Sequence, residues 1–360
     1  MEHGKSYSIV DLFCGAGGLT HGLALEGFHI AAGIDSDPAC RYPYEHNNPG
    51  TRFIGKKIED VSPEDLKALY PENTTRILVG CAPCQPFSSY TNSIDKSKKD
   101  ENKWGLLYRF GKYVETLQPV VVSMENVPNL VRFDGGRVLD DFLSILKSNG
   151  YHVSIAIVKC TDYGIPQMRE RLVLLASRVG KIDLIPPTHT QASYRTVRET
   201  IGKLPALEAG ESNHADPLHR ASTLSPLNMR RMKASRPNGT WRDWPEELRA
   251  SCHKKDSGKT YPGVYGRMTW SEPSPTITTQ CFGFGNGRFG HPEQDRALSL
   301  REAALLQTFP IDYQFVEPGG EYRIKTIGRL IGNAVPVDLG RVIAKSIAKH
   351  LDEVGEHCDR

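Results

Sequence analysis

The chain has 360 residues, of which 39% are hydrophobic and 24% charged, and its 45 Lys and Arg against 42 Asp and Glu leave a net charge of +3. This composition is that of an ordinary globular protein, and the length favours two domains. Because residues 1–6 lack the apolar stretch of a signal peptide and no run is long enough to span a membrane, we expect a cytoplasmic protein with reduced cysteines.

Short apolar runs alternate with helical patterns over about the first 175 residues. A glycine-rich turn at 15–18 separates the first run from a short helix at 19–26, and Ser62 followed by Pro63 marks another helix start. The runs that predict strands are 7–13, 28–34, 77–79, 120–124, 154–158 and 171–176. Such alternation predicts an α/β domain with a Rossmann-like, doubly wound and mostly parallel sheet, covered on both faces.

The sequence changes character near residue 181, where prolines begin to interrupt every longer pattern. This predicts a smaller, loop-rich β domain. Helical patterns resume at Ser299, which forms a capping box with Glu302, and again at 336–351. We expect a first domain at 1–180, a second at 181–290, a hinge with a supporting helix at 291–327, and a return to the first domain at 328–360.

The predicted second domain is the more basic part of the chain. Residues 181–295 contain 16 Lys and Arg against 12 Asp and Glu, a net charge of +4. Six basic residues follow one another there without an acidic residue between them: Arg220, Arg230, Arg231, Lys233, Arg236 and Arg242. Such a stretch suits a phosphate backbone, and an ordinary solvated face is the alternative.

The turn after the first predicted strand reads Asp11-Leu-Phe-Cys-Gly-Ala-Gly-Gly-Leu19. Glycines at this place let the main chain approach a ligand, and Asp35 ends the next strand, where an acid can bind ribose hydroxyls. The G-x-G-G spacing differs from the G-x-G-x-x-G of dinucleotide sites, so a nucleoside cofactor without pyrophosphate fits better. A tight packing turn is the alternative.

A cysteine and a carboxylate end two further predicted strands. Pro83-Cys84-Gln85-Pro86 follows the run at 77–79, and Glu125 with Asn126 follows the run at 120–124. Since parallel sheets carry their chemistry at the carboxyl ends of the strands, a thiol and an acid there could attack and protonate a flat heterocycle. Cys81 and Cys84 also form a C-x-x-C, but the other cysteines provide no second pair, which disfavours structural zinc; a redox site would belong in a far shorter domain.

The sequence QMRER at 167–171 precedes the last predicted strand. Alternation would place Gln167, Arg169 and Arg171 on one side, where guanidinium groups could hold phosphate or orient a carboxylate. An exposed edge with surface salt bridges is the alternative.

Together these motifs resemble those of the C5-cytosine DNA methyltransferases, in family order and over nearly the whole chain. The matching segments are DLFCGAGG (11–18), APCQPFS (82–88), ENV (125–127), QMRER (167–171), ALSLREAALLQTFP (297–310) and IGNAVPVDLG (331–340). The resemblance implies the class I methyltransferase fold, with a catalytic, cofactor-binding first domain and target recognition in the second.

The implied reaction is methyl transfer to carbon 5 of cytosine. The implied catalytic residues are Cys84, Glu125, Arg169, Arg171, Asn126 and Pro83. Cys84 would add to C6 and make C5 nucleophilic, while Glu125 would hydrogen-bond N3 and the exocyclic amine. Asn126 would position Glu125 or the nucleophile loop, and Arg169 would hold Glu125 or the target's sugar-phosphate, with Arg171 assisting.

The implied methyl donor is S-adenosylmethionine, and no metal is expected. The implied cofactor residues are Phe13, Cys14, Gly15, Gly17, Gly18, Leu19, Asp35, Ile58, Asp60, Asn333 and Val335. Many relatives carry an acid two or three residues before Asp60, where this chain has Lys57. Either Asp60 or the main chain of Ile58 should therefore contact the adenine.

The implied partner is double-stranded DNA, bound by a monomer, with a separately acting restriction endonuclease as a further candidate partner. A base inside the duplex must swing out to reach such a site, and segment 88–103 would close over it. The candidate DNA contacts are Gln85, Ser88, Arg230, Arg231, Arg236, Arg242 and Arg288, beside Asn238 and the glycine-rich 283–290.

Two related alternatives remain open. A tRNA-methylating branch of the same fold typically has two prolines before the nucleophile and a Cys-Phe-Thr signature, whereas this chain has Ala82-Pro83 and Cys281-Phe282-Gly283. A non-catalytic DNA-binding relative would keep only the fold, yet Cys84 and Glu125 are both present.

Overall fold

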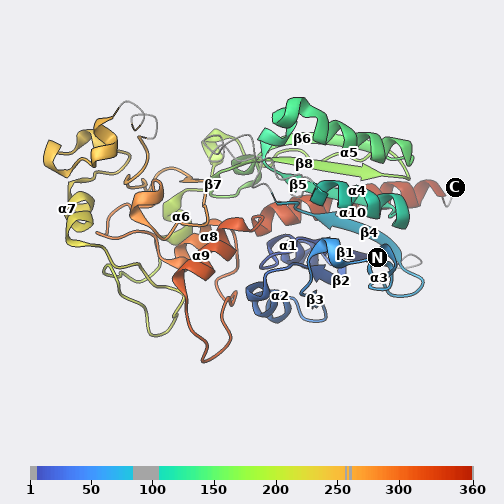
Figure 1. Ribbon diagram of the computed structural model, residues 1–360, viewed down its shortest axis with the longest axis horizontal. Helices are drawn as coiled ribbons and strands as arrows, with labels where there is room; N and C mark the ends of the chain where they lie inside the picture. Colours follow the sequence, from blue (N-terminus) through green and yellow to red (C-terminus); the bar gives the residue numbers. More distant parts are fainter. Residues whose placement is uncertain (1–5, 84–104, 256–257, 259–261, 359–360) are drawn as a thin grey trace. The chain divides into compact units, whose positions relative to one another are not determined.

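The computed structural model describes residues 6–83, 105–255, 258 and 262–358 (Figure 1). The chain divides into two compact units. The first unit comprises Met1–Lys159, Glu170–Pro187 and Val337–Arg360, and the second comprises Cys160–Arg169 and Thr188–Pro336. Each unit is therefore assembled from segments that lie far apart in the sequence.

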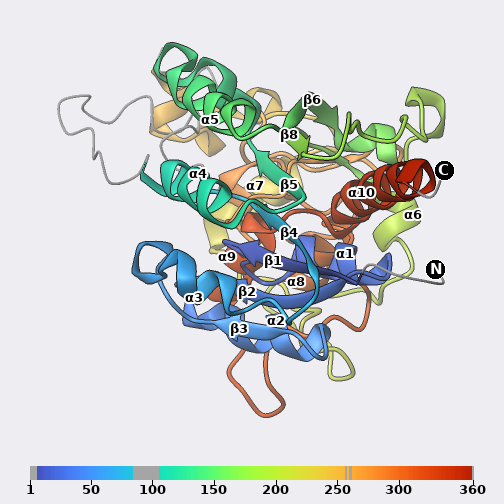
Figure 2. The ribbon, with the colours of Figure 1, turned by 90° about the vertical axis from the view of Figure 1, so that its right-hand side faces the viewer.

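A seven-stranded sheet forms the centre of the first unit, in the order β3-β2-β1-β4-β5-β8-β6 (Figures 1 and 2). Its strands are β1 (Tyr7–Leu12), β2 (His29–Ile34), β3 (Arg52–Ile54), β4 (Thr75–Gly80), β5 (Val121–Asn126), β6 (His152–Lys159) and β8 (Glu170–Ser177). Strands β1 to β5 pair in parallel, whereas β8 runs antiparallel between β5 and β6. The predicted doubly wound, mostly parallel sheet is confirmed, and its strand order reverses at β1 and β4, the switch point where such sheets bind ligands.

Helices cover both faces of this sheet. They are α1 (Gly18–Leu25), α2 (Arg41–Asn47), α3 (Pro63–Lys67), α4 (Gly105–Leu117), α5 (Arg137–Ser148) and α10 (Val337–Cys358). Figure 2 shows α3, α4 and α5 on one face and α1 and α10 on the other. Ser62 caps α3 with a capping box to Asp65, as its sequence predicts for a helix start.

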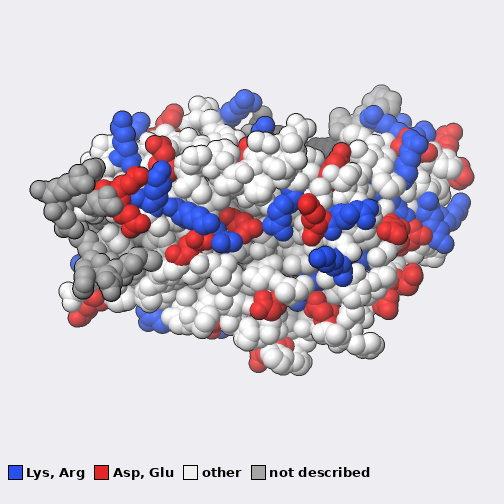
Figure 3. Space-filling model, turned by 180° about the vertical axis from the view of Figure 1, so that it is seen from behind, with Lys and Arg blue, Asp and Glu red and all other residues white. Residues whose placement is uncertain are grey.

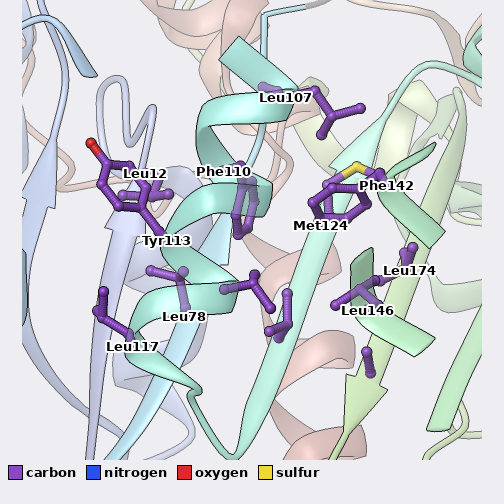
Figure 4. Packing of buried hydrophobic residues seen from close by; sticks show 14 of the residues in the cluster. Leu12, Leu78, Leu107, Phe110, Tyr113, Leu117, Met124, Phe142, Leu146 and Leu174 are labelled. Atoms are coloured by element: carbon purple, nitrogen blue, oxygen red, sulfur yellow. The ribbon is translucent and has the colours of Figure 1, made fainter. Parts of the chain in front are cut away.

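The main hydrophobic core lies between the sheet and helices α4 and α5. Phe110 and Tyr113 of α4 pack toward Leu78 and Met124 of the sheet, and all four side chains are fully buried (Figure 4). Burial of each such side chain contributes about 1.5–3 kcal/mol. This packing holds the carboxyl ends of β4 and β5 in fixed positions.

On the opposite face, α1 and α10 touch through their main chains. A Cβ atom added to Gly22 would lie 2.4 Å from the carbonyl oxygen of Val337, and one added to Gly340 would lie 2.9 Å from that of Leu19. Larger residues at either glycine would push the helices apart. The last helix of the chain is thus held against the helix that follows the glycine-rich turn.

The second unit has little regular structure. Its α-helices are α6 (Val197–Ile201), α7 (Pro226–Ala234), α8 (Leu300–Leu306) and α9 (Ile324–Asn333), and its strands are the two-residue β7 (Gln167–Met168) and β9 (Ser274–Pro275). The predicted loop-rich character is present, but β structure among its described residues is limited to the β7–β9 pair and isolated bridges. Closely spaced prolines account for this, because each removes a donor from a strand ladder.

The beginning of α8 is as predicted. Ser299 accepts a hydrogen bond from the Glu302 main chain, and the Glu302 carboxylate accepts one from the main chain of Ser299. The same carboxylate forms a buried two-bond pair with Arg296, at 2.7 Å for each bond. None of the described helices is long and apolar enough to cross a membrane.

Candidate active site

The glycine-rich turn follows β1 at the switch point of the sheet. Phe13, Gly15 and Gly17 all have left-handed backbone conformations, with φ of 60°, 54° and 90°. The Gly15 main chain donates to Oδ2 of Asp35 at 3.0 Å, and Oδ1 of Asp35 accepts from Asp37 at 2.9 Å. The turn and the acid at the end of β2, predicted as one site, therefore lie in contact.

The remaining turn residues form the support of this site. Cys14 and Leu19 are 7% and 3% exposed, and Gly18 is buried at the start of α1. A Cβ atom added to Gly15 would meet no atom within 4 Å, so open space lies over this glycine. The main chain of Gly15 therefore borders that space.

A buried polar group that the sequence analysis did not predict lies near the turn. Asp11 is 1% exposed, and its Oδ2 accepts a hydrogen bond from Thr20 at 2.7 Å. Thr20 also lies 3.1 Å from the Tyr44 hydroxyl, which approaches closely because residue 33 is glycine. Burial raises the pKa of Asp11 to about 7. An aspartate inside an apolar strand was the available sequence signal.

The two candidate adenine contacts, Ile58 and Asp60, lie in the segment after β3 and differ in solvent exposure. Ile58 is 4% exposed, and its carbonyl accepts a hydrogen bond from the Tyr113 hydroxyl at 2.7 Å. Asp60 is exposed. Arg109 secures the same segment by donating to the Val61 carbonyl at 2.7 Å.

Glu125, at the end of β5, is 6% exposed and forms an ion pair with Arg171. The Arg171 Nε lies 2.7 Å from Oε1 of Glu125, and the two side chains are 13% and 8% exposed. The antiparallel register of β8 explains the pair, because Leu172 lies opposite Asn126 and Arg171 directly precedes it. The contact is a close charge–charge pair without hydrogen-bond geometry, and it keeps the Glu125 carboxylate next to Arg171.

Asn126 connects the end of β5 to the loop that follows β4. Its Nδ2 donates to the Ala82 carbonyl at 3.2 Å, and its Oδ1 accepts from the Val127 main chain at 2.9 Å. Burial raises the pKa of the Cys81 thiol well above its usual value, and the nearby charge of Glu125 raises it further. Pro83 is exposed. Residues 81–83, here called the stem of the predicted nucleophile loop, therefore lie beside the end of β5, which carries Glu125.

Three predicted residues of this loop, Cys84, Gln85 and Ser88, lie outside the described residues, as does the predicted lid at 88–103. Their predicted roles in catalysis and DNA binding therefore stay predictions.

The arginine motif is divided between the two units. Its burial alternates as expected, because Gln167 and Arg169 are 0% and 4% exposed whereas Met168 between them is 58% exposed. Gln167 belongs to β7, which pairs with β9, whereas Arg171 lies in β8 of the main sheet. Arg169 is 4% exposed and donates to the Ile277 carbonyl at 3.1 Å. The partner of Glu125 that the described contacts reveal is Arg171.

A second unpredicted network surrounds Arg169 in the second unit. Gln167 donates to the Gln307 side chain at 2.8 Å, and Gln307 donates to the carbonyls of Ile331 at 2.8 Å and Ala334 at 3.1 Å. Gln167 and Gln307 are both fully buried. Because they lie 140 residues apart, no local sequence signal could have paired them.

The closing motif lies at the end of α9, also in the second unit. Asn333 is exposed and Val335 is 6% exposed. A Cβ atom on Gly332 would lie 2.2 Å from the carbonyl carbon of Thr278, so α9 packs against that main chain. The contact fixes the main chain directly before Asn333.

The candidate DNA contacts separate into exposed and internal residues. Arg230, Arg236 and Arg242 are exposed. Arg231, also predicted as a DNA contact, is 9% exposed, and its Nε donates to the Leu248 carbonyl at 2.8 Å. Arg288 is partly buried and donates to the Gly239 carbonyl at 2.7 Å.

The described part of the chain was compared with two kinds of site, a metal site and a surface of uniform charge. No group of three or more His, Cys, Asp or Glu side chains within it is arranged to hold a metal ion. On the face drawn in Figure 3, basic and acidic side chains of the described residues lie interspersed, without a broad patch of one charge.

The chain is similar in sequence to known proteins over nearly its whole length. The family model for C-5 cytosine-specific DNA methylases matches residues 7–349. The Type II methylase M.HgiDII of Herpetosiphon aurantiacus is 57% identical, over 97% of this chain and 97% of its own length. The Type II methyltransferase M.PspPI of a Psychrobacter strain is 31% identical, over 98% of this chain and 81% of its own length.

A solved structure supports the fold independently. It is that of a prophage-encoded Escherichia coli protein, described as a DNA modification methyltransferase, with a TM-score of 0.73 at 20% identity. The match covers 96% of this chain and 100% of that one. Because the family model matches residues 7–349 and a relative is 57% identical over nearly its whole length, the chain belongs to the C-5 cytosine-specific DNA methylases and is a DNA cytosine-5-methyltransferase.

Proposed function

We propose that the protein transfers a methyl group from S-adenosylmethionine to carbon 5 of a flipped-out cytosine, within a specific sequence of duplex DNA. The observation that carries this proposal is the contact of Glu125 with Arg171, beside the stem of the loop that bears Cys84. It supports an acid held in one orientation next to a nucleophile loop, which the chemistry of the cytosine ring requires.

The proposed reaction begins with the Cys84 thiolate, which forms a bond to C6 of the cytosine. The electron pair of the C5–C6 double bond moves toward N3, where the Glu125 carboxyl stabilises it by hydrogen bonding or proton donation. C5 becomes enamine-like and bonds to the methyl group, while the methyl–sulfur bond breaks and its electron pair stays on the donor sulfur as a thioether. Loss of the C5 proton then regenerates the double bond and expels Cys84.

Arg171 and Asn126 act as positioning residues in this scheme. Arg171 holds one oxygen of Glu125, so that the carboxyl presents a fixed face to the base. Asn126 links the end of β5 to Ala82, two residues before Cys84. Displacement of either group by even an ångström would misplace nucleophile and acid relative to the same ring.

The residues of the glycine-rich turn fit the methyl donor. Open space lies over Gly15, and Asp35 stands in contact with that turn, as a ribose-binding acid should. When bound, S-adenosylmethionine supplies a methyl group on a sulfonium sulfur that C5 of the cytosine accepts. The turn would bind its methionine part, with Asp35 at the ribose and Ile58 or Asp60 at the adenine; Asn333 and Val335 are further proposed lining residues.

DNA recognition is proposed for the second unit, with Arg230, Arg236 and Arg242 as exposed contacts. Gln85 and Ser88 would approach the flipped base from the nucleophile loop. Both relatives described above are Type II enzymes by name, so this chain is proposed to protect the sites of a separately acting restriction endonuclease.

A duplex that contains 5-fluorocytosine at the target tests the mechanism, because fluorine cannot leave as a proton does. With S-adenosylmethionine present, the wild-type chain should form a covalent protein–DNA adduct that survives denaturation. Cys84→Ala should form none. Loss of the adduct in wild type, while ordinary DNA is still methylated, would refute addition at C6.

A further inference from the structure

Segment 225–243 of the second unit, here named the reading segment, consists of the N-cap of α7, the helix itself and the turn that follows. It carries five Lys and Arg and one Asp, a net charge of +4. Its exposed basic side chains are Arg230, Lys233, Arg236 and Arg242. The single acid, Asp243, accepts from the Thr240 main chain at 2.8 Å and from Arg236 at 3.0 Å. The segment therefore presents positive charge to solvent.

The inner face of the reading segment belongs to an aromatic core. Met232 and Trp241 are buried in a cluster with Trp244. The Arg231 guanidinium lies 5.8 Å from the ring centre of Trp244 and 5.3 Å from that of Tyr265. Because these contacts occupy one side of α7 and its turn, only the opposite side is available to a partner.

One buried and one partly buried arginine hold the turn at several points. Arg267 is 5% exposed, and its Nε donates to the Ser235 carbonyl at 2.9 Å. The carbonyl of Arg267 in turn accepts from the Asn238 main chain at 3.1 Å, while Arg288 donates to the Gly239 carbonyl at 2.7 Å. The turn is thus held rigidly, as a base-reading side chain requires.

Asn238 occupies the tip of this turn. Its φ of 56° is left-handed, a conformation that a non-glycine residue adopts at a cost and that asparagine tolerates best. The residue is exposed, and its carboxamide makes no hydrogen bond to any other described residue. A carboxamide offers a donor and an acceptor side by side, which matches N7 and the exocyclic amine of adenine in the major groove.

We propose that the reading segment enters the major groove of the DNA substrate and that Asn238 reads an adenine there, while the exposed basic residues of α7 contact phosphates. The inference rests on the proposed function, in which a specific duplex sequence is the substrate. It assigns sequence discrimination to one side chain and non-specific affinity to its neighbours.

The test compares methylation patterns on a duplex library with randomised positions around cytosine, determined by base-resolved sequencing of methylcytosine. Asn238→Gly removes the carboxamide but suits the left-handed backbone. It should reduce the preference for adenine at one position about 5- to 100-fold and leave preferences at the other positions unchanged. An unchanged preference at every position would overturn the assignment.

Asn73→Gly is the matched control. Asn73 is also exposed and left-handed, with a φ of 58°, but it lies in the first unit. The control should keep the wild-type methylation pattern. If both variants relax the same position equally, the effect belongs to the protein as a whole and the assignment fails.

A double variant, Arg230→Ala with Lys233→Ala, tests the phosphate contacts separately. It should weaken binding to every sequence alike and reduce the slope of log affinity against log salt by about 2. A change in base preference without a change in slope would contradict the phosphate role. If wild type itself yields no preferred sequence, the proposed function fails; a clear wild-type sequence that Asn238→Gly leaves intact refutes only the inference.

Discussion

Asp11→Asn removes the ionisable group near the glycine-rich turn without changing its shape. Asp11 is 1% exposed, and its Oδ1 has no hydrogen-bond partner among the described residues. Its Oδ2 accepts from Thr20, a bond that the asparagine carbonyl can retain. The asparagine amide nitrogen would replace the unpartnered Oδ1, so only the pH-dependent part of the stability difference isolates the effect of the buried charge.

The expected effect follows from the raised pKa of Asp11, about 7 in the folded protein against 3.8 in the unfolded chain. Between these pH values the folded state binds one more proton, so the contribution of Asp11 to stability declines as pH rises and is lost above pH 7. Over the roughly two pH units from pH 5 to pH 7, the free energy of unfolding should fall by about 1.36 kcal/mol per unit, which amounts to about 3 kcal/mol. The variant should gain that much relative to wild type between pH 5 and pH 8.

Urea denaturation of both proteins at several pH values measures this difference. Asp183→Asn is the matched control, because Asp183 is an exposed aspartate whose carboxylate also accepts a hydroxyl hydrogen bond, from Ser154. Parallel stability curves for wild type and Asp11→Asn would show that Asp11 titrates alike in both states and would refute the reasoning.

Two further predictions concern packing and catalysis. Gly332→Ala places a Cβ atom 2.2 Å from the carbonyl carbon of Thr278 and should destabilise the protein by about 3 kcal/mol. Gly355→Ala, with no neighbour within 4 Å, should stabilise α10 by up to about 1 kcal/mol, and equal melting temperatures for the two would contradict this account. Arg171→Lys keeps the charge but loses the guanidinium geometry beside Glu125, so the single-turnover methylation rate should fall about 10- to 100-fold. Normal turnover in that variant would show that the pair does not position the acid.

Six of the seven strands of the first unit's sheet were predictable because their signal is local, whereas the three-residue strand β3 was not predicted. The first apolar run was predicted at 7–13 and the strand spans Tyr7–Leu12; the second was predicted at 28–34 and spans His29–Ile34. The capping box of Ser299 and Glu302 likewise depends on residues three apart. Hydrophobic burial and helix capping need little knowledge of distant segments.

Which side chains meet was less predictable. The sequence placed two arginines within reach of Glu125 and favoured Arg169, but the antiparallel insertion of β8 brings Arg171 to it. Arg231 looked like its exposed neighbour Arg230, and the aromatic core decided otherwise. Neighbouring residues of one type differ in role once packing selects a face.

The sequence by itself determined six of the seven strands of the main sheet, the glycine-rich turn and the family-like motifs, since these depend on neighbouring residues. Only the tertiary structure decided the Glu125–Arg171 pair, the buried Asp11 and the Gln167–Gln307 network. The physical reason is that a buried charge or amide must find its partner in space, and these partners lie up to 140 residues away along the chain.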